Sequence, residues 1–324
     1  MFSRRKIVTG LGGLALLPLS HAASAQQGRT VRLVVPAAAG GAIDAIGRLY
    51  AERLKDILGQ SWVVENRAGA NNTIGAAEVA RAAPDGATLL TNADIHLMAK
   101  HVMKQVPYDP VADFTPISRF ATSPMVFVGH PGKTPADLEA LAAEMKAAPD
   151  KHTFSNSGLG AMGHLASESF NTAIGIKTVI VSYRGTAPAL TDVIGGQTTL
   201  MVAPLGSALQ QIQAGSLRAF AVMSERRSPQ LPDVPSIAEA GFPGLNFLLW
   251  YALWGPKGMA PDLVGQLNAA VQTASKHPDL VQKLTALGAE PVTESAAEFA
   301  AFFTAEAARG AELARVAGIQ PPAN

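Results

Sequence analysis

Along this chain, short apolar runs rich in β-branched residues alternate with longer segments in which apolar residues recur every three or four positions. The run at residues 31–35 predicts a buried strand, and apolar residues from Ile43 to Leu54 follow it at the spacing of one helical face. Gly59 stands where this helix should end, as its C-terminal cap. The alternation continues to residue 91 and predicts a β-α-β-α-β order with parallel strands.

A second unit of the same kind begins near Met125, after a loop-like segment that ends at Thr115-Pro116. Its first helix should start at Thr134, with Pro135 in the first helical position. Further strands are predicted at 178–182, 198–202, 218–223 and 248–254, and helices at 261–276, 280–287 and 295–316. The helical tail is too short for a third domain, so we expect it to pack on the first lobe.

Two Gly-rich loops occupy matching places, each between a strand and an amphipathic helix. They lie at residues 37–44 and 156–164. A helix N-terminus leaves backbone N–H groups unpaired and carries partial positive charge, so such a loop is suited to an anion such as a carboxylate. Two loops a domain's length apart predict a cleft in which both lobes hold one anionic ligand.

The first 25 residues predict export. Arg4, Arg5 and Lys6 precede an apolar run at residues 7–19, and Ala23-Ser24-Ala25 forms an A-x-A cleavage site after Ala25. The run is shorter than the roughly 18 residues that span a bilayer, so it predicts a signal peptide and no membrane insertion. The pair of arginines is compatible with twin-arginine export, and ordinary Sec export stays an equal alternative.

Charge and composition exclude several classes of function. Cleavage after Ala25 leaves 23 basic and 25 acidic residues, a net charge of −2, which does not suit nucleic-acid binding. The chain has no cysteine, and about 300 residues can bury enough apolar surface to fold without disulfides. No zinc-site or nucleophile-elbow motif occurs, so we expect neither a metal nor a cofactor.

The order of many sequence blocks resembles a known family. These blocks are VVPAAAGGAID, VVENRAGANNTIGAAEVARAAPDGATLL, YDPVADFTPIS, SNSGLGAMGHLA, YRGTAPALTDVIGGQ, LPDVPSIAEAG and ALGAEPV. The chain is similar in this respect to the extracytoplasmic solute-binding proteins of tripartite tricarboxylate transporters, also called the Bug family. The resemblance implies a periplasmic, non-enzymatic receptor that captures a small organic carboxylate and presents it to membrane transporter subunits.

The resemblance also implies a fold: an α/β, two-lobed periplasmic binding protein of type II-like architecture, with the ligand cleft between the lobes. We expect residues 28–124 and 253–324 to form one lobe, residues 125–252 to form the other, and the protein to be a monomer. Two chain crossings would then act as the hinge.

Ligand-binding residues carried over from the family lie in the two Gly-rich loops. They are Ala39, Gly40, Gly41 and Asp44 in the first loop, and Ser157, Gly158, Leu159, Gly160, Ala161 and His164 in the second. Asn92 and Tyr183 are added because ligands of open α/β sheets lie beyond the carboxyl ends of strands. Arg184, next to Tyr183, is either a further contact or a solvated surface charge.

Each of these residues also has a structural explanation. Glycines at positions 40 and 41 could serve only a tight turn. Asp44 stabilises a helix dipole whether or not a ligand exists, and its alternative role is to hold an ordered water or an array of N–H groups. A lone histidine such as His164 is more often a hydrogen-bonding partner within the protein than a ligand contact.

The chain departs from the family pattern at two positions. Ala37-Ala38-Ala39 stands where many members have prolines, which makes the first loop less stiff. Ala203-Pro204 replaces an Asp-Asn pair that is common after the third strand of the second lobe. If this position lines the pocket, the far end of the ligand should differ from that of an amino acid, whose ammonium group needs a partner.

The alternative function is an exported NAD(P)-dependent oxidoreductase. Residues 158–163, GLGAMG, match G-x-G-x-x-G between a strand and a helix. A dinucleotide site also needs an acidic residue at the end of the next strand, whereas this one ends in Val181-Ser182-Tyr183. A structural or adhesive surface protein is disfavoured as well, because the sequence contains no repeats.

Overall fold

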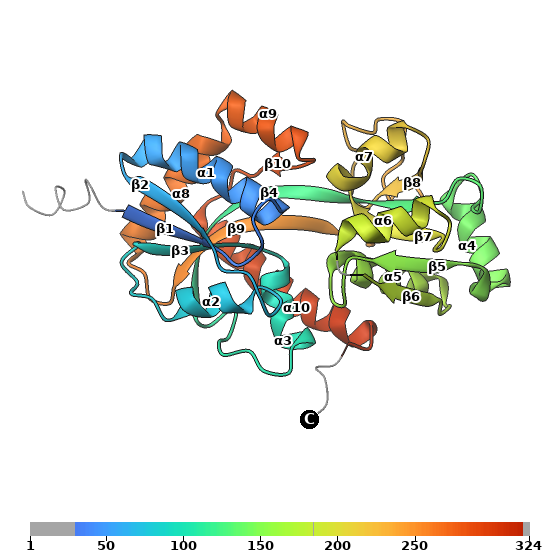
Figure 1. Ribbon diagram of the computed structural model, residues 1–324, viewed down its shortest axis with the longest axis horizontal. Coiled ribbons are helices and arrows are strands. Elements are labelled where there is room, and N and C mark those ends of the chain that lie inside the picture. The colour runs from blue at the N-terminus through green and yellow to red at the C-terminus, as the bar shows by residue number, and fades with distance from the viewer. Residues whose placement is uncertain (1–29, 184, 320–324) are drawn as a thin grey trace, which may run out of the picture.

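The computed structural model describes residues 30–183 and 185–319. The predicted signal peptide and Arg184 therefore lie outside the described residues. The described chain forms two α/β lobes connected by long strands, as expected (Figure 1). Among these residues no helix is long and apolar enough to cross a membrane.

The first lobe begins with three strand-helix units. Its elements are β1 (Thr30–Val35), α1 (Ala42–Leu58), β2 (Ser61–Asn66), α2 (Thr73–Ala80), β3 (Thr88–Ala93) and α3 (Ile95–Val102). The strands are parallel, and the sheet runs in the order β2-β1-β3-β9-β4, with β9 antiparallel to β3. Gly59 ends α1 in the left-handed conformation that its C-cap position predicted.

The second lobe repeats this plan. Its elements are β4 (Phe114–Gly129), α4 (Leu138–Ala147), the 3-10 helix η1 (Pro149–Lys151), β5 (Thr153–Asn156), α5 (Met162–Ile174), β6 (Val179–Ser182), α6 (Thr186–Ile194), β7 (Leu200–Pro204), α7 (Leu205–Gln213) and β8 (Arg218–Val222). Its strands lie in the order β6-β5-β7-β4-β8, which matches the first sheet position by position.

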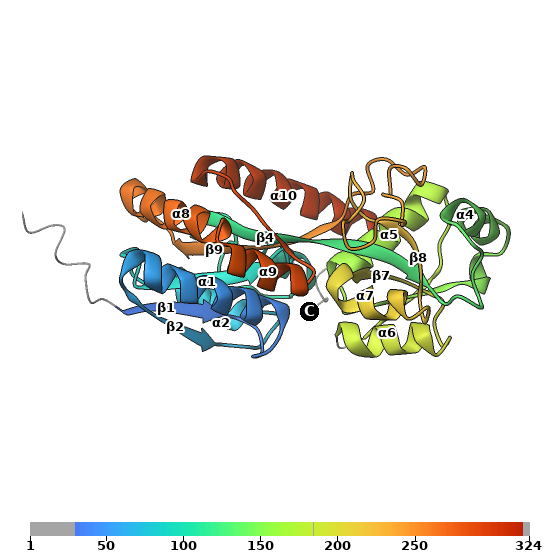
Figure 2. The same ribbon diagram turned by 90° about the horizontal axis from the view of Figure 1, so that it is seen from above.

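The chain then returns to the first lobe. The returning elements are β9 (Leu248–Pro256), α8 (Pro261–Ser275), α9 (Pro278–Ala286), β10 (Glu290–Pro291) and α10 (Ala296–Val316). Because β9 pairs with β4 from Leu248↔Pro124 to Pro256↔Phe114, the two strands form a long ribbon along the molecule (Figure 2).

Strand β4 belongs to both sheets, and its length shows that the expected loop before Met125 is wrong. Phe114 to Pro124 pair with β9, whereas Met125 to Gly129 pair with β7 and β8. The segment at Thr115-Pro116 is therefore strand, not loop. Proline is tolerated there because the β4–β9 register shifts between Pro116 and Ser118.

Helix α4 starts three residues later than predicted, with Leu138 and not Pro135 in the first helical position. The hydroxyl group of Thr134 donates to the carbonyl oxygen of His130 at 2.8 Å and is used in a turn. Asp137 caps the helix instead, since its carboxylate accepts from the N–H of Ala140 at 2.8 Å.

Helix α10 packs on both lobes, which corrects the expectation that the tail packs only on the first. Phe299 and Phe303 join Trp250 and Trp254 in a buried aromatic cluster of the first lobe. Farther along the chain, Ala314 and Ile319 lie in the hydrophobic core of the second lobe. The two tryptophans are on one face of β9 and fully buried.

Candidate ligand-binding cleft

A cavity of about 430 Å³ lies between the lobes, where strands from both sheets end and helices begin. Its wall includes residues that follow β1 and β3 in the first lobe and β5 and β7 in the second. Carboxyl ends of parallel strands are the usual position of ligands in open α/β sheets. The topology therefore directs the first turns of several helices at one space.

The first Gly-rich loop is organised by Asp44. Its carboxylate accepts hydrogen bonds of 2.9 Å from the N–H of Gly40, from Arg48 Nε and from Asn66 Nδ2. Burial alone would raise the pKa of Asp44, but these donors hold it below the usual value for an aspartate. Gly40 has φ +84°, which explains the glycine at that position.

The first turn of α1 provides the open donors of this loop. Ala45 is the first residue whose N–H donates within the helix, to the carbonyl oxygen of Gly41 at 2.9 Å. The N–H groups of Ala42 and Ile43 have no helical acceptor, and both residues line the cavity with Gly41. An anion in the cavity can accept from this turn.

The second loop uses most of its own N–H groups internally. Gly158 donates to Asn156 Oδ1 at 2.8 Å, Gly160 donates to His164 Nδ1 at 3.3 Å, and Ala161 donates to the carbonyl oxygen of Gly158. Burial lowers the pKa of His164, so its ring stays neutral and Nδ1 can accept. His164 therefore supports the loop.

The open donors of the second lobe lie in the first turn of α5. Met162 and Gly163 begin this helix and line the cavity. A β-carbon on Gly163 would lie 2.3 Å from the carbonyl oxygen of Val202, so only glycine lets α5 approach β7 this closely. The helix N-terminus is thus fixed against the sheet, with its first residues in the wall of the cleft.

Of the residues predicted from the sequence, Gly41, Ser157 and Ala161 line the cavity. The remaining predicted residues, Ala39, Gly40, Asp44, Asn92, Gly158, Leu159, Gly160, His164 and Tyr183, lie in or near the two loops and strands but are not part of its wall. Tyr183 donates from its hydroxyl group to Asp192 Oδ2, outside the cavity. Thr186, at the start of α6, lines the cavity in its place.

Asn92 does not lie beyond the end of its strand, as the sequence predicted. Strand β3 continues to Ala93, two residues beyond the predicted end, so Asn92 lies inside the strand and is fully buried. Its Oδ1 accepts from Asn72 Nδ2 at 3.1 Å, and Asn72 lines the cavity. Asn72 follows Ala70 and Asn71 in a run of three non-glycine residues with positive φ, which Asn92 helps to hold.

The sequence did not reveal the acidic residue of the wall. Asp94 follows β3 and lines the cavity with Tyr251 of β9. Burial raises the pKa of Asp94 to about 7, and the Glu306 carboxylate adds to the rise. No lysine, arginine or histidine occurs among the described wall residues, so the only positive ends that face the cavity from these residues are helix N-termini.

Two tight contacts bring the lobes together beside the cavity. A β-carbon on Gly206, in the first turn of α7, would lie 2.4 Å from the carbonyl oxygen of Leu287 in the first lobe. A β-carbon on Gly160 would lie 2.3 Å from Val102 Cγ1 of α3. Glycines at both points thus let the lobes touch.

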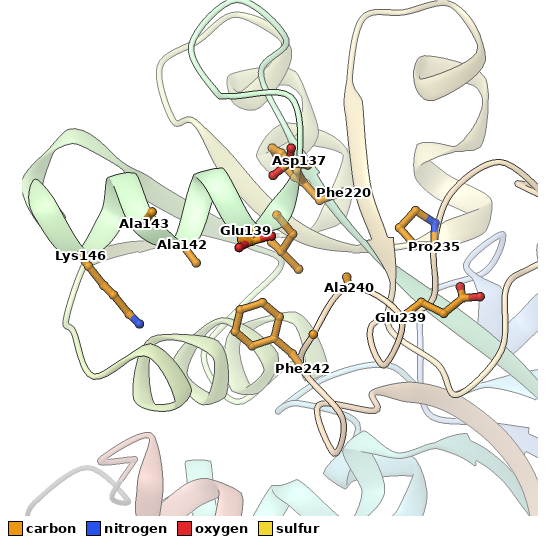
Figure 3. A pocket seen from close by; sticks show the side chains of 12 residues that line it. Asp137, Glu139, Ala142, Ala143, Lys146, Phe220, Pro235, Glu239, Ala240 and Phe242 are labelled. Carbon is orange, nitrogen blue, oxygen red and sulfur yellow. The ribbon is translucent and has the colours of Figure 1, made fainter.

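A larger cavity, about 680 Å³, lies within the second lobe (Figure 3). It is bounded by α4 and by a loop that includes Phe242. Asp137, Glu139 and Glu239 line it together with a single cation, Lys146. Three carboxylates disfavour an organic anion, so size alone does not make this the ligand site. Among the described residues, no group of three His, Asp or Glu side chains could hold a metal ion.

The comparisons agree with this architecture. Residues 46–319 match the model of the tripartite tricarboxylate transporter family receptor. Protein BugT of Bordetella pertussis is 34% identical over 292 residues, which cover 90% of this chain and 90% of that protein. The structure of the periplasmic binding protein BugD is 35% identical, with a TM-score of 0.76 and coverage of 91% of this chain and 99% of that one.

The R. palustris protein Rpa4515, whose structure was solved with adipate, is 34% identical with a TM-score of 0.79. The alignment covers 91% of this chain and 99% of Rpa4515. Sequence and fold agree across nearly the full described chain. This protein belongs to the tripartite tricarboxylate transporter receptor family.

Proposed function

We propose that this receptor captures a small organic carboxylate in the periplasm and delivers it to the membrane subunits of a tripartite tricarboxylate-type transporter. Its family and the adipate complex of Rpa4515 support a carboxylate ligand. The observation that carries the proposal is the cavity into which α1 and α5 of opposite lobes direct their first turns.

In the proposed complex, the ligand carboxylate accepts hydrogen bonds from the N–H groups of Ala42 and Ile43 on one side and of Met162 and Gly163 on the other. Each charge-assisted hydrogen bond contributes about 1.5–3 kcal/mol. Because the donors belong to different lobes, the ligand stabilises the contact between the lobes, and closure excludes water from the carboxylate.

The predicted residues that do not line the cavity receive indirect roles in this proposal. Asp44 fixes the loop before α1 through Gly40, and His164 fixes the loop before α5 through Gly160. They orient the donors without contacting the ligand. The proposal also includes export with cleavage after Ala25, a monomeric receptor and release of an unaltered ligand.

Lobe boundaries near residues 124 and 252 are also proposed. The exchange of β4 partners between Pro124 and Met125 supports the first boundary. Pairing of β9 with β4 from Leu248 onward supports moving the second boundary a few residues earlier. The oxidoreductase alternative has no support from the comparisons, and in the GLGAMG loop Gly158 and Gly160 donate their N–H groups to Asn156 and His164 instead of a phosphate.

The test is a thermal-shift screen of the purified mature protein against mono-, di- and tricarboxylates, followed by calorimetric titration. A ligand that binds only the native state raises the midpoint by an amount that grows with its concentration over Kd. Magnetic resonance of the recovered ligand should show no chemical change. Absence of any carboxylate that binds, or conversion of the bound one, would contradict the proposal.

A further inference from the structure

Asp94 is a carboxyl group in the wall of the cleft. It has no role in the proposed binding of a ligand carboxylate by backbone N–H groups. It lines the cavity and is only 7% exposed. It stands at the N-cap position of α3, where aspartate normally accepts from the helix. Here its side chain makes no cap hydrogen bond; its carboxylate accepts from the N–H of its own residue, and no side chain of the described residues donates to it.

Among the described residues, no cation offsets the charge of the Asp94 carboxylate. Tyr251 of β9 is a neutral neighbour in the cavity wall; burial raises its pKa, and the Asp94 carboxylate adds to the rise. Glu306 of α10 is a second carboxylate, and it is already paired with Arg309 at 3.2 Å. A buried carboxylate without a cation is costly, so a group that supplies positive charge in the cavity would be strongly favoured.

We propose that Asp94 selects a ligand with an ammonium group, so that this receptor binds a zwitterionic amino acid in preference to a dicarboxylate. The inference rests on the proposed function and adds the far end of the ligand to it. The ligand carboxylate binds at the helix N-termini, and its ammonium group binds Asp94. A second ligand carboxylate in this place would be repelled by Asp94 while both are ionised.

The opposite wall of the cavity supports the assignment of the ammonium group to Asp94. Pro204, at the end of β7, lines the cavity and carries no charge, while Ala203 is buried. The sequence suggested a ligand without an ammonium group, because Ala203-Pro204 stands there in place of an Asp-Asn pair. The structure provides the acidic partner from the first lobe instead, after β3.

The experiment compares ligands that differ only at one end. The amino acids are the ω-amino acids with two to five methylene groups, L-alanine and L-leucine. Each is compared with the corresponding acid without the amino group, and each ω-amino acid also with the dicarboxylate that has the same number of methylene groups. Titrations use the wild-type protein, Asp94→Asn and Asp94→Ser at pH 6 and pH 8, with circular dichroism and thermal unfolding as folding controls.

At pH 8 the wild-type protein should bind at least one amino acid at least tenfold more tightly than its matched dicarboxylate and deaminated acid. The preference should decrease at pH 6, because Asp94 becomes protonated, and should vanish in folded Asp94→Asn at both pH values. Asp94→Ser should behave in the same way. If only one variant folds, that variant decides, and the wild-type ranking decides if neither folds.

Two results overturn the inference in different ways. If wild-type protein prefers dicarboxylates at pH 8, or if Asp94→Asn keeps the preference for an amino acid, the proposed selection by Asp94 is wrong. The proposed binding of a carboxylate at the two helix N-termini is not contradicted by either result. If the wild-type protein binds none of the compounds and no other carboxylate in the screen above, the proposed function fails with it.

Discussion

Gly206 of the second lobe contacts the carbonyl oxygen of Leu287 in the first lobe so closely that a β-carbon on Gly206 would lie 2.4 Å from that oxygen. The contact lies beside the cleft, because both residues also line the cavity. It involves backbone on the Leu287 side, which cannot move away as a flexible side chain would. The separation of the lobes at this edge therefore depends on the absence of one methyl group.

We expect Gly206→Ala to hold the lobes apart and to weaken carboxylate binding. Overpacking typically costs about 1–3 kcal/mol, which corresponds to roughly a five- to 150-fold loss of affinity. Small-angle scattering with ligand should show a less compact molecule than the wild type. Gly265→Ala is the control, since a β-carbon there meets no atom within 4 Å, and it should leave affinity unchanged. Equal affinity of both variants would show that this contact does not limit closure.

Ala42→Pro should remove one N–H donor from the cleft without disturbing the helix. Proline suits the first helical position, and Gly41 before it is extended, with φ −76° and ψ 168°. Loss of a hydrogen bond to a charged group should weaken carboxylate binding by about 1.5–3 kcal/mol, roughly tenfold or more.

Ala42→Ser keeps the N–H and is the matched control in the same calorimetric titration. Met162→Pro compared with Met162→Ala repeats the test on α5, where Ala161 is also extended, with φ −64° and ψ 152°. Full affinity in folded Ala42→Pro would exclude the first turn of α1 from the site.

Asp44→Asn should destabilise the protein at neutral pH, because Gly40, Arg48 and Asn66 all donate to this carboxylate. The expected loss is about 1.5–3 kcal/mol. The pKa of Asp44 is lowered in the folded state, so its contribution is present above the unfolded value near pH 4 and is lost as pH falls through the lower folded value. Urea unfolding of both proteins from pH 7 to pH 3 should show a difference that shrinks below pH 4; a difference that does not change with pH would contradict this role.

Arg119→Lys should destabilise the attachment of α10. Arg119 Nε donates to Glu294 Oε1 at 3.1 Å and Nη2 to Oε2 at 2.7 Å, and the guanidinium group lies 3.9 Å from the centre of the Phe302 ring. Lysine keeps the charge but loses the paired geometry, so the midpoint of urea unfolding should fall by the equivalent of about 1.5–3 kcal/mol.

Arg315→Lys is the control for this change. Arg315 makes a similar two-bond pair with Glu312 on the exposed surface of the same helix. Solvent screens such a pair, so its loss should leave the unfolding midpoint unchanged. If both variants unfold together with the wild type, the Arg119 pair does not contribute to the attachment of α10.

The sequence by itself determined the alternation of strands and helices, the family and the presence of a Gly-rich loop before α1 and α5, because these depend on local periodicity and on the order of blocks. Gly59, the first helix and strand β9 follow directly from spacing. Thr115-Pro116 was misjudged because strand pairing with distant β9 overrides local turn chemistry.

Only the tertiary structure decided which atoms are available to a ligand. Gly158 and Gly160 have the right position in the loop, but side chains four residues away or less accept their N–H groups. Asp94 lies in the cleft because β3 runs on to Ala93, and α10 joins both lobes because its two ends meet different cores. Such facts depend on contacts between segments far apart in the chain, and residue spacing along one segment contains no information about them.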